Sequence, residues 1–379
     1  MKIRLLFKII ILIALFCFSN SYAFDMDQEN IKIGIILDVS SFTTGSSKYF
    51  FVSDSSNKKF KITRGTINIA CSKKGIRIGK YDLSLPVKIK PSNGAIFANS
   101  KPYRGYILLI KSGKKINVIN VLNIEDYVKG VLPKEVNSGW PKEALKVQAV
   151  ISRTYAIANL NSHSTQGFDL CSMTHCQVYG GLGVETESSN QAVLETKWEI
   201  LTFEGRPAQT VFHATCAGHT EDPKYIWGWE ETPPYLKGVK CPYCSNSPYA
   251  RWEESLDEKG IRANLNLKDI NIGKIKKINI KRKTPSGAAK EVEIIHSNGK
   301  CVLNAYKFRL TIDAWKIKSH FFDYIKVKDN KIFFKGKGWG HKAGLCQYGA
   351  KGMAEKRKHY TKILRHFYPG TKIETVNFK

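Results

Sequence analysis

The sequence predicts an α+β fold in which a β-rich N-terminal lobe precedes a mixed α/β region. Short β-branched or aromatic runs, separated by turn residues, fill residues 28–120. Two helix-compatible segments follow in residues 121–160, and residues 257–336 return to alternating strand and helix signals. With 42% apolar residues and no low-complexity tract, the 379-residue chain has enough apolar side chains to bury a sizeable core.

Residues 1–23 have the pattern of a targeting segment. Three cations precede an apolar stretch over residues 9–18, and Ala23 ends a small-x-small cleavage site. The apolar stretch is short for a membrane span, so we expect cleavage and export to the periplasm or cell envelope. Retention of the segment as a membrane tether is the alternative.

The chain is strongly basic. Its formal net charge of +28 falls to +25 once Lys2, Arg4 and Lys8 are removed with the targeting segment. An excess of this size suits a polyanionic partner. We do not expect nucleic acid as the partner because an exported protein meets little of it, which leaves anionic cell-wall polymer or a membrane surface. The lysines are spread along the chain, so a lysine-rich composition without a specific partner is the alternative.

The N-terminal lobe is expected to span residues 24–120. Turn residues such as Gly65 and residues 91–94 bound its strands. The predicted strands cover residues 31–36, 59–62, 66–70, 87–89 and 106–110. No catalytic pattern is visible here, so the lobe is expected to support the block that follows.

A short helix is predicted immediately after this lobe, over residues 124–129. Asn123 is suited to cap its N-terminus, and Gly130 suits the position after its last turn. Pro133 is then expected to prevent the helix from continuing.

A second helix is predicted to begin at Pro141 and to continue to Leu160. The connection between the two helices carries Glu135, close to Trp140. A carboxyl held between packed helices loses water, which raises its pKa and suits it to general acid catalysis. A solvated loop residue without a catalytic role is the alternative.

Cysteine and histidine are concentrated in residues 163–176. His163, Cys171, His175 and Cys176 supply the ligand types of a tetrahedral zinc site. Their spacing differs from that of a zinc finger, and exported chains also form disulfides. From the residues alone, a zinc site and a Cys171–Cys176 disulfide are therefore equal alternatives.

Further cysteines include Cys216 and the pair Cys241-x-x-Cys244. In an exported protein they favour a disulfide, either Cys216–Cys241 or Cys216–Cys244. Cys71 and Cys301 are expected to be ordinary strand residues.

Residues 257–336 form a candidate sub-domain. Asn298-Gly299 and Asp329-Asn330 are expected to be hairpin turns. The predicted strands cover residues 274–281, 292–295, 325–328 and 332–334, and the predicted helix covers residues 304–310.

Glycine-rich residues 336–349 precede a helix predicted to continue to about Arg357, and a last helix is expected over residues 361–369. Glycines before a helix let a ligand approach the backbone N–H groups at its N-terminus. A phosphate-binding loop is the alternative, and the absence of a following Gly-Lys-Ser/Thr argues against it.

The block from Val121 to Tyr155 resembles the signature of the stage II sporulation protein D family, whose domain also occurs in the LytB amidase enhancers. The shared pattern has an acid–Tyr pair, Gly-Val-x-Pro, a following acid, Trp-Pro, Glu-Ala-Leu, Gln and Arg-Thr-Tyr. The matching residues are Glu125, Asp126, Tyr127, Gly130, Val131, Pro133, Glu135, Trp140, Pro141, Glu143, Ala144, Leu145, Gln148, Arg153, Thr154 and Tyr155. The resemblance continues downstream, so residues 121–379 are expected to form one catalytic region of this family's type.

This resemblance implies a peptidoglycan lytic transglycosylase that acts on glycan strands lacking stem peptides, with Glu135 as the catalytic residue. One Glu suffices in such an enzyme, because it acts first as an acid and then as a base. The implied substrate-binding residues of the same block are Trp140, Gln148, Arg153 and Tyr155. The alternative is a non-catalytic glycan-binding module that enhances a cell-wall amidase, and the presence of Glu135 favours the enzyme.

Two downstream elements also resemble the family. Residues 212–221 are similar to its His-(Ser/Ala)-x-x-Gly-Gly-x-Thr element, with Ala217 where Gly is frequent. Residues 336–347 are similar to its Gly-x-Gly-x-Gly-His-Gly-x-Gly-Met-Ser-Gln element, with Lys342 replacing a glycine and Cys346 a serine. The substrate-binding residues implied in this part of the chain are His213, Tyr235, His341 and Gln347.

The family resemblance also implies a zinc ion held by one His and two Cys. Cys171 and Cys176 would be the thiolate ligands, and either His163 or His175 the imidazole ligand. Such a zinc would be structural, because the sequence has no motif of an open catalytic metal site.

Overall fold

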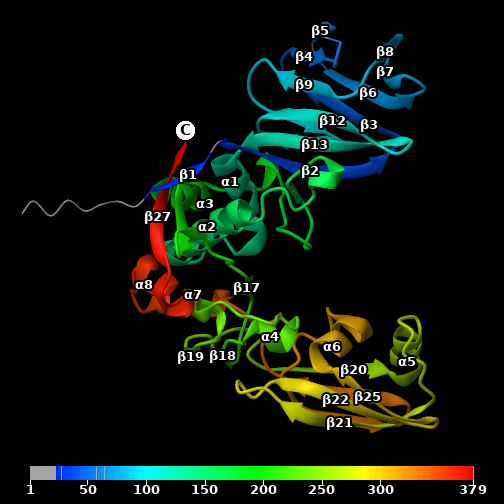
Figure 1. Cartoon of the computed structure of the whole chain (residues 1–379), viewed down its shortest axis with the longest axis vertical. Helices are drawn as coiled ribbons and strands as arrows, with labels where there is room; N and C mark the ends of the chain where they lie inside the picture. Colours follow the sequence, from blue (N-terminus) through cyan, green and yellow to red (C-terminus); the bar gives the residue numbers. More distant parts are fainter. Residues whose placement is uncertain (1–22, 27, 57, 64, 379) are drawn as a thin grey trace, which may run out of the picture.

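The computed structural model describes residues 23–26, 28–56, 58–63 and 65–378. Apart from Ala23, the predicted targeting segment lies outside these described residues. The described chain is a mixture of helices and strands with a β-rich N-terminal lobe, which confirms the predicted α+β class (Figure 1).

The N-terminal lobe consists of two sheets. One has seven strands in the order β14–β2–β13–β12–β9–β4–β5, and the other has six in the order β11–β10–β3–β6–β7–β8. The bounds of these strands are β2 Asn30–Val39, β3 Ser41–Ser46, β4 Phe50–Ser53, β5 Lys59–Ile62, β6 Gly65–Ser72, β7 Gly75–Ile78, β8 Tyr81–Leu83, β9 Val87–Pro91, β10 Ile96–Ala98, β11 Lys101–Tyr103, β12 Tyr106–Ser112, β13 Lys115–Asn123 and β14 Leu170–Cys171.

Strand burial in this lobe follows the sequence pattern. On β9, Val87 and Ile89 are buried while the intervening lysines are exposed, as expected for a strand with one face on a core. On β13, seven consecutive residues are buried because both faces are covered. Phe168 and Cys171 cover one of those faces against Ile119 and Val121.

Three helices follow the lobe: α1 (Ile124–Glu135), α2 (Lys142–Ala158) and, further along the chain, α3 (Glu187–Glu195). α2 packs against both α1 and α3, and apolar residues of α1 and α2 join the core of the N-terminal lobe. Asn123 caps α1 as predicted, because its side chain accepts a hydrogen bond of 2.8 Å from the Glu125 N–H.

The predicted end of the first helix at Lys129 is wrong. α1 passes through Gly130 and Pro133 and ends at Glu135. Gly130 is needed for packing and not for a helix end, since a Cβ at this position would overlap the ring of Tyr179. Proline in the last turn removes one N–H donor without preventing helical backbone in the following residues. Glu135 is therefore the last residue of a helix, and not part of a loop.

A third sheet has the strand order β1–β27–β15–β16. Because β1 pairs in parallel with β27, the two ends of the described chain lie side by side (Figure 1). Helices α7 and α8 pack against α2. The bounds are β1 Ala23–Met26, β15 Glu199–Phe203, β16 Arg206–Pro207, β27 Lys372–Phe378, α7 Gln347–Glu355 and α8 Tyr360–Phe367.

Residues 252–336 form a second lobe with its own apolar core. Both predicted hairpins are confirmed, as β22–β23 and β24–β25, and so is the predicted helix, as α6. Strand β20 belongs to this lobe and lies before the expected boundary at residue 257. The bounds are β20 Trp252–Asp257, α5 Glu258–Asn266, β21 Ile275–Lys283, β22 Ala289–His296, β23 Gly299–Asn304, α6 Ala305–Asp313, β24 Phe322–Lys328 and β25 Lys331–Gly336.

Short elements connect the helices to the second lobe. Strand β17 pairs in parallel with β26, which places His213 beside Cys346, and β18 pairs with β19. The bounds are η1 Ser164–Gln166, η2 Leu182–Val184, β17 Phe212–His213, β18 Gly218–His219, α4 Pro223–Ile226, η3 Pro234–Leu236, β19 Lys240–Cys241 and β26 Leu345–Cys346.

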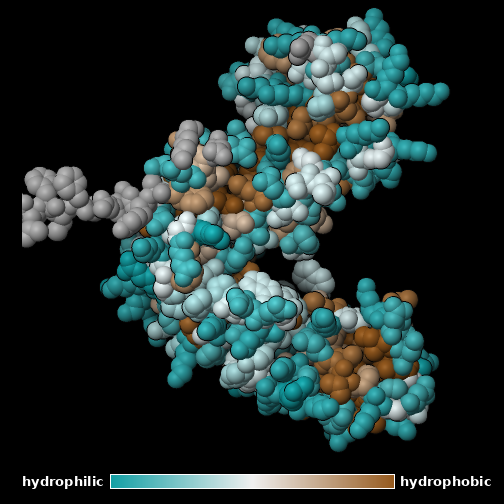
Figure 2. Space-filling model, viewed as in Figure 1, coloured by the Kyte–Doolittle hydropathy of each residue, from teal (hydrophilic) through white to brown (hydrophobic). Residues whose placement is uncertain are grey.

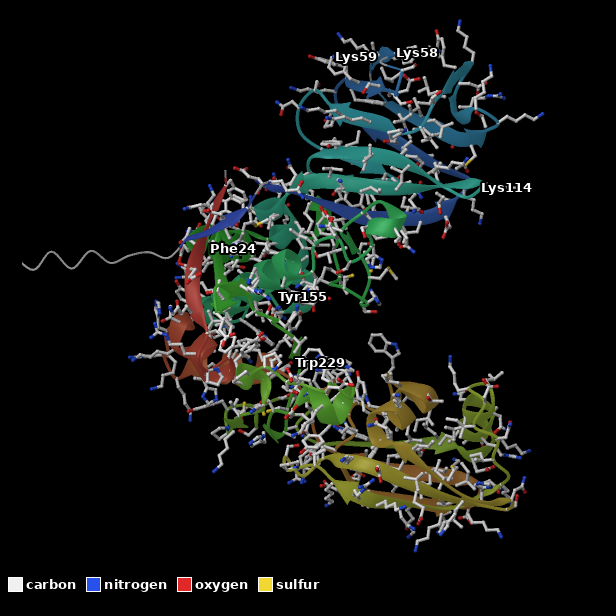
Figure 3. The ribbon with its side chains drawn as sticks, viewed as in Figure 1. Phe24, Lys58, Lys59, Lys114, Tyr155 and Trp229 are labelled. Carbon is white, nitrogen blue, oxygen red and sulfur yellow. The ribbon has the colours of Figure 1, made fainter. Side chains whose placement is uncertain are left out.

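The surface is notched between the N-terminal lobe and the second lobe (Figure 2). Tyr155 of α2 and Trp229, which follows α4, lie near the inner end of this notch (Figure 3). Within the described ranges, no helix has the length and apolar character that a membrane span requires.

Candidate functional site

The candidate acid, Glu135, is half-buried at the C-terminal end of α1. Its Oε1 accepts a hydrogen bond of 3.1 Å from the backbone N–H of Val178. Burial raises the pKa of the Glu135 carboxyl above its ordinary value, although the Val178 N–H and the charge of Lys134 act in the opposite direction. In the part of the chain that the structure describes, no other hydrogen bond to this carboxyl is found, so Oε2 remains open to a ligand.

Two predicted glutamines contact each other, and one of them, Gln347, also contacts Glu135. Nε2 of Gln347 donates to the backbone carbonyl of Glu135 at 3.2 Å and to Oε1 of Gln148 at 3.3 Å. Gln148 in turn donates to Oγ of Ser152 at 3.2 Å. The structure thus brings together residues more than 200 positions apart in sequence, and it fixes the end of α1 against α2 and α7.

A group of aromatic rings extends the candidate site beyond Gln347. The ring of Trp140 lies 5.0 Å from that of Tyr348, edge to face, and Lys351 lies over both rings. Tyr249 contacts Tyr348 and also Trp339, at centroid distances of 6.1 and 4.2 Å. Trp140 is half-buried, so one part of the indole remains open to a ligand.

Tyr155 is a half-buried residue of α2. Burial, together with the nearby Cys176, Cys171 and Glu135, raises the pKa of its phenol to about 12. The phenol is therefore neutral at pH 7 and available as a hydrogen-bond donor.

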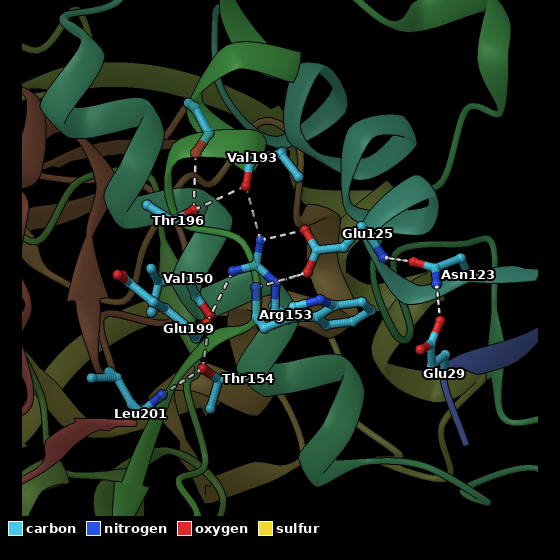
Figure 4. Close-up of polar contacts among 12 residues, drawn as sticks. Glu29, Asn123, Glu125, Val150, Arg153, Thr154, Val193, Thr196, Glu199 and Leu201 are labelled. Atoms are coloured by element: carbon cyan, nitrogen blue, oxygen red, sulfur yellow. Dashed lines mark hydrogen bonds and ion pairs between the residues drawn. The ribbon is translucent and has the colours of Figure 1, made fainter. Parts of the chain in front are cut away.

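Arg153 does not take part in a surface that a substrate can reach. Its side chain is fully buried, and its guanidinium donates to both carboxylate oxygens of Glu125 at 2.6 and 2.8 Å (Figure 4). It also donates to the backbone carbonyls of Glu199 and Val193. The implied substrate-binding role is thus not supported by these surroundings, because every one of these contacts is internal and ties α2 to α1, α3 and β15.

His213 and His341 are brought together, with ring centroids 5.5 Å apart. Nδ1 of His213 donates to the carbonyl of Ala343 at 3.0 Å, which leaves Nε2 as an unpartnered acceptor among the described residues. Burial lowers the pKa of His213 well below its ordinary value and that of His341 to about 4. Both imidazoles are therefore neutral at pH 7. Trp227 contacts His341 at 5.0 Å.

Tyr235 is buried, and its hydroxyl accepts a hydrogen bond of 3.0 Å from the Gln209 N–H. Its ring packs on Phe203 at 5.0 Å. These contacts assign Tyr235 to the core beneath the site.

The first cysteine–histidine cluster consists of His163, Cys171, His175 and Cys176, whose ligand atoms all lie within 4.8 Å of one another. Sγ of Cys176 lies 3.4 Å from both Nε2 of His163 and Nδ1 of His175. Both histidines lie close to the thiols, so His163 and His175 could both be ligands, and not only one of them as the sequence suggested. Two thiolates and two imidazoles are a donor set that fits tetrahedral zinc without an open position.

The second cysteine cluster consists of Cys216, Cys241, Cys244 and Cys346. The Cys216–Cys241 and Cys216–Cys244 disulfides expected from the sequence are not formed, and neither is Cys171–Cys176; each of the eight cysteines that the structure describes is free. Cys71 and Cys301 lie in strands β6 and β23, as expected.

Both positions that depart from the family's glycine pattern have left-handed backbone. Ala217 has φ +62° and Lys342 has φ +73°. Such φ values favour glycine. Lys342 is fully buried; its Nζ lies over the ring of Phe321 and 3.4 Å from Oγ of Ser286. Burial lowers the pKa of Lys342 to about 8, although the charge of Glu221 opposes this.

Sequence reasoning missed three features of the site. The Val178 N–H is a backbone donor and leaves no residue-type signal. Glu125 and Arg153 both matched the family pattern, but nothing in the sequence indicated that they form an ion pair. Cys346 was visible as a serine replacement, and counting it with Cys216 and the Cys241-x-x-Cys244 pair would have indicated the second cluster.

Comparison with known families identifies two segments. A family model described as a stage II sporulation protein matches residues 112–203, which include Glu135 and the first cluster. A second, described as a domain of unknown function, matches residues 243–344, which cover the second lobe.

Individual relatives match over longer stretches. An uncharacterized protein from Brachyspira hyodysenteriae is 31% identical over 365 residues, which cover 96% of each chain. The stage II sporulation protein D of Bacillus subtilis is 29% identical over 269 residues, covering 67% of this chain and 75% of its own. The amidase enhancer of Bacillus subtilis is 28% identical over 375 residues, covering 85% of this chain and 50% of its own. This chain therefore spans about half the length of that enhancer.

Proposed function

The chain belongs to the stage II sporulation protein D family, and from that premise we propose that it is an exported lytic transglycosylase of peptidoglycan. Its substrate would be the linkage between N-acetylmuramic acid and N-acetylglucosamine in glycan strands that lack stem peptides. The observation that carries this proposal is Glu135. It is a half-buried carboxyl with a raised pKa, one oxygen held by Val178 and the other open.

In the first step, protonated Glu135 donates its proton to the glycosidic oxygen. The bond between that oxygen and C1 of N-acetylmuramic acid breaks, and N-acetylglucosamine leaves with a new hydroxyl group. A raised pKa favours this step, because it keeps a larger fraction of the carboxyl protonated near neutral pH.

In the second step, the Glu135 carboxylate takes the proton of the C6 hydroxyl on the same N-acetylmuramic acid. The C6 oxygen bonds to C1 and closes a 1,6-anhydro ring, and Glu135 is protonated again. No water is consumed, so the second carboxylate that glycoside hydrolases use to activate water is not needed.

The surrounding residues would position the glycan and the acid. Gln347 and Gln148 fix the backbone carbonyl at the end of α1. Trp140, five residues after the acid in sequence, would offer an apolar face to the glycan. His213 and His341 are both neutral, so they would add no charge beside the site.

A zinc ion at the first cluster would be held by His163, Cys171, His175 and Cys176. With all four ligands bound, the ion would act structurally, by fixing the loop that leads to Val178.

The partners would lie in the cell envelope. The large positive charge suits the anionic polymers of a cell wall. A cell-wall amidase would be a functional partner, because removing stem peptides supplies the denuded strands that this reaction requires.

A second candidate function is a non-catalytic glycan-binding enhancer of a cell-wall amidase. The observation that favours it is the 85% of this chain that matches the amidase enhancer of Bacillus subtilis. An enhancer would not need a proton donor at position 135, whereas Glu135 is present with its carboxyl partly open.

The experiment is mass spectrometry of the products that the purified chain releases from amidase-treated peptidoglycan. Products ending in 1,6-anhydromuramic acid are expected from wild type and from the exposed-site control Glu187→Gln, and none from Glu135→Gln. Reducing-end products would instead indicate a hydrolase. No products from any variant, together with retained glycan binding, would favour the enhancer.

A further inference from the structure

Four cysteines that are far apart in sequence meet between the helices and the second lobe. They come from three segments: Cys216 follows β17, Cys241 and Cys244 lie in and after β19, and Cys346 ends β26 (Figure 1). Their Sγ atoms all lie within 4.8 Å of one another. The four residues are 0 to 3% exposed.

We infer that this cluster is a second, structural zinc site with four thiolate ligands. A tetrahedral site with Zn–S distances of about 2.3 Å places the sulfurs about 3.8 Å apart. Sγ of Cys216 lies 3.6 Å from Sγ of Cys244, close to that spacing. Disulfides join sulfurs in pairs at about 2.05 Å and do not require two pairs to converge. A single central metal ion, by contrast, requires all four sulfurs to lie close to one another, as they do here.

Backbone N–H groups already point at the sulfurs. Sγ of Cys346 accepts from the N–H of Cys216 at 3.3 Å and from the N–H of Gly349 at 3.2 Å. Such donors stabilise thiolate ligands and orient them. Cys346 also caps the N-terminus of α7, where the helix dipole favours negative charge. Gly349 has no room for a side chain, because a Cβ there would overlap Sγ of Cys241.

An ion can reach the cluster from solvent. A hollow of about 280 Å³ opens beside it and is lined by Cys241, Cys244, Ala217 and Gly218, among others. A closed ligand set with an entry path on one side meets the requirements of a structural metal site.

The position of the cluster gives the metal a defined role. Cys346 directly precedes Gln347, which contacts the Glu135 carbonyl, and it pairs with His213 across β17 and β26. The ion would fix the start of α7 and the connection to the second lobe. This inference does not depend on the proposed reaction.

The test measures metal content and cysteine state in the purified full chain. Cys346→Ser restores the residue that the family has at this position and is expected to lower bound zinc by one ion per chain. Cys301→Ser, a strand cysteine outside both clusters, is the matched control and should leave the zinc content unchanged. Equal zinc content in wild type and Cys346→Ser would overturn the inference.

A second measurement avoids the risk that Cys346→Ser does not fold. In Cys171→Ser/Cys176→Ser the first cluster is removed, and Co²⁺ added to this variant should give the intense thiolate-to-cobalt absorption of a four-sulfur site. Peptide mapping of wild type without reduction should find no disulfide among the four cysteines. A Cys216–Cys241 or Cys216–Cys244 disulfide, or four free thiols without bound metal, would overturn the inference.

Discussion

The backbone N–H of Val178 donates a hydrogen bond of 3.1 Å to Oε1 of Glu135. Val178 follows Cys176 by two residues, so the acid is held by the segment that leaves the first cysteine–histidine cluster. Between them, Gln177 accepts a hydrogen bond from the hydroxyl of Tyr127 on α1. The geometry of the acid is therefore coupled to the geometry of the cluster.

Disrupting the first cluster should lower the turnover number of the proposed reaction. In Cys176→Ser, the loop that presents Val178 loses a ligand and Glu135 loses its fixed orientation, so we expect kcat to fall about 10- to 100-fold. The measurement is the rate of release of 1,6-anhydro products. Cys71→Ser, in strand β6 of the N-terminal lobe, should match wild type. An unchanged kcat in Cys176→Ser would contradict the prediction, because it would show that the first cluster does not control the orientation of Glu135.

The pH dependence of the reaction should show the raised pKa of Glu135. The first step needs the protonated carboxyl, so the rate should fall as pH rises through the pKa of Glu135. Burial raises that pKa, so the fall should occur above the ordinary Glu value of about 4.3. The measurement is kcat/KM against pH. A fall centred at the ordinary value would show that the free enzyme leaves this carboxyl solvated.

The same carboxyl should reduce stability at higher pH. Because its pKa is raised in the folded state, the folded chain binds more protons than the unfolded chain between the two pKa values. The free energy of unfolding therefore falls as pH rises through this window. Glu135→Gln removes the ionisable group, so its Tm relative to wild type should increase with pH. Glu187→Gln, at an exposed position on α3, should show no such trend.

Much of the fold followed from local sequence signals. The hairpin turns at Asn298-Gly299 and Asp329-Asn330 and the Asn123 cap were predicted because turn and cap residues act within a few positions. Helix α1 was predicted too short because Gly130 and Pro133 are read locally as stop signals. Glycine is needed at position 130 because the ring of Tyr179, 49 positions away in sequence, leaves no space for a side chain.

The candidate site was predictable as residues but not as contacts. The family pattern identified Glu135, Gln148 and Gln347, and the structure brings them together. The family pattern could not show the role of Arg153, because an arginine in a sequence looks the same whether its guanidinium binds a ligand or a buried carboxylate. That difference depends on tertiary packing around Glu125, which spacing does not encode.

Arg153→Met should destabilise the chain without any direct effect on substrate contacts. It leaves the buried Glu125 carboxylate without its cation, which costs about 3–5 kcal/mol of the free energy of unfolding. The surface pair Arg77–Asp82 gives a matched control, and Arg77→Met should leave the free energy of unfolding almost unchanged. The measurement is denaturant unfolding. Adding Glu125→Leu to Arg153→Met should recover part of the loss, and no recovery would indicate that the backbone contacts of Arg153 dominate.

Ala217→Gly should stabilise the chain, which is the opposite of what this substitution usually does. Ala217 has φ +62°, where an L-residue with a Cβ costs about 1–2 kcal/mol. Glycine removes that strain but adds about 0.4–1 kcal/mol of conformational freedom to the unfolded chain. The net expectation is a gain of about 0.5–1 kcal/mol in the free energy of unfolding.

The matched control for this prediction is Ala263→Gly, at an exposed position of helix α5. There the backbone is helical, so the same substitution should cost about 1 kcal/mol. Urea midpoints of both variants, compared with wild type, give the two signs directly. Loss of stability in both would mean that the Ala217 methyl contributes more by packing beside Gly338 than its backbone strain costs.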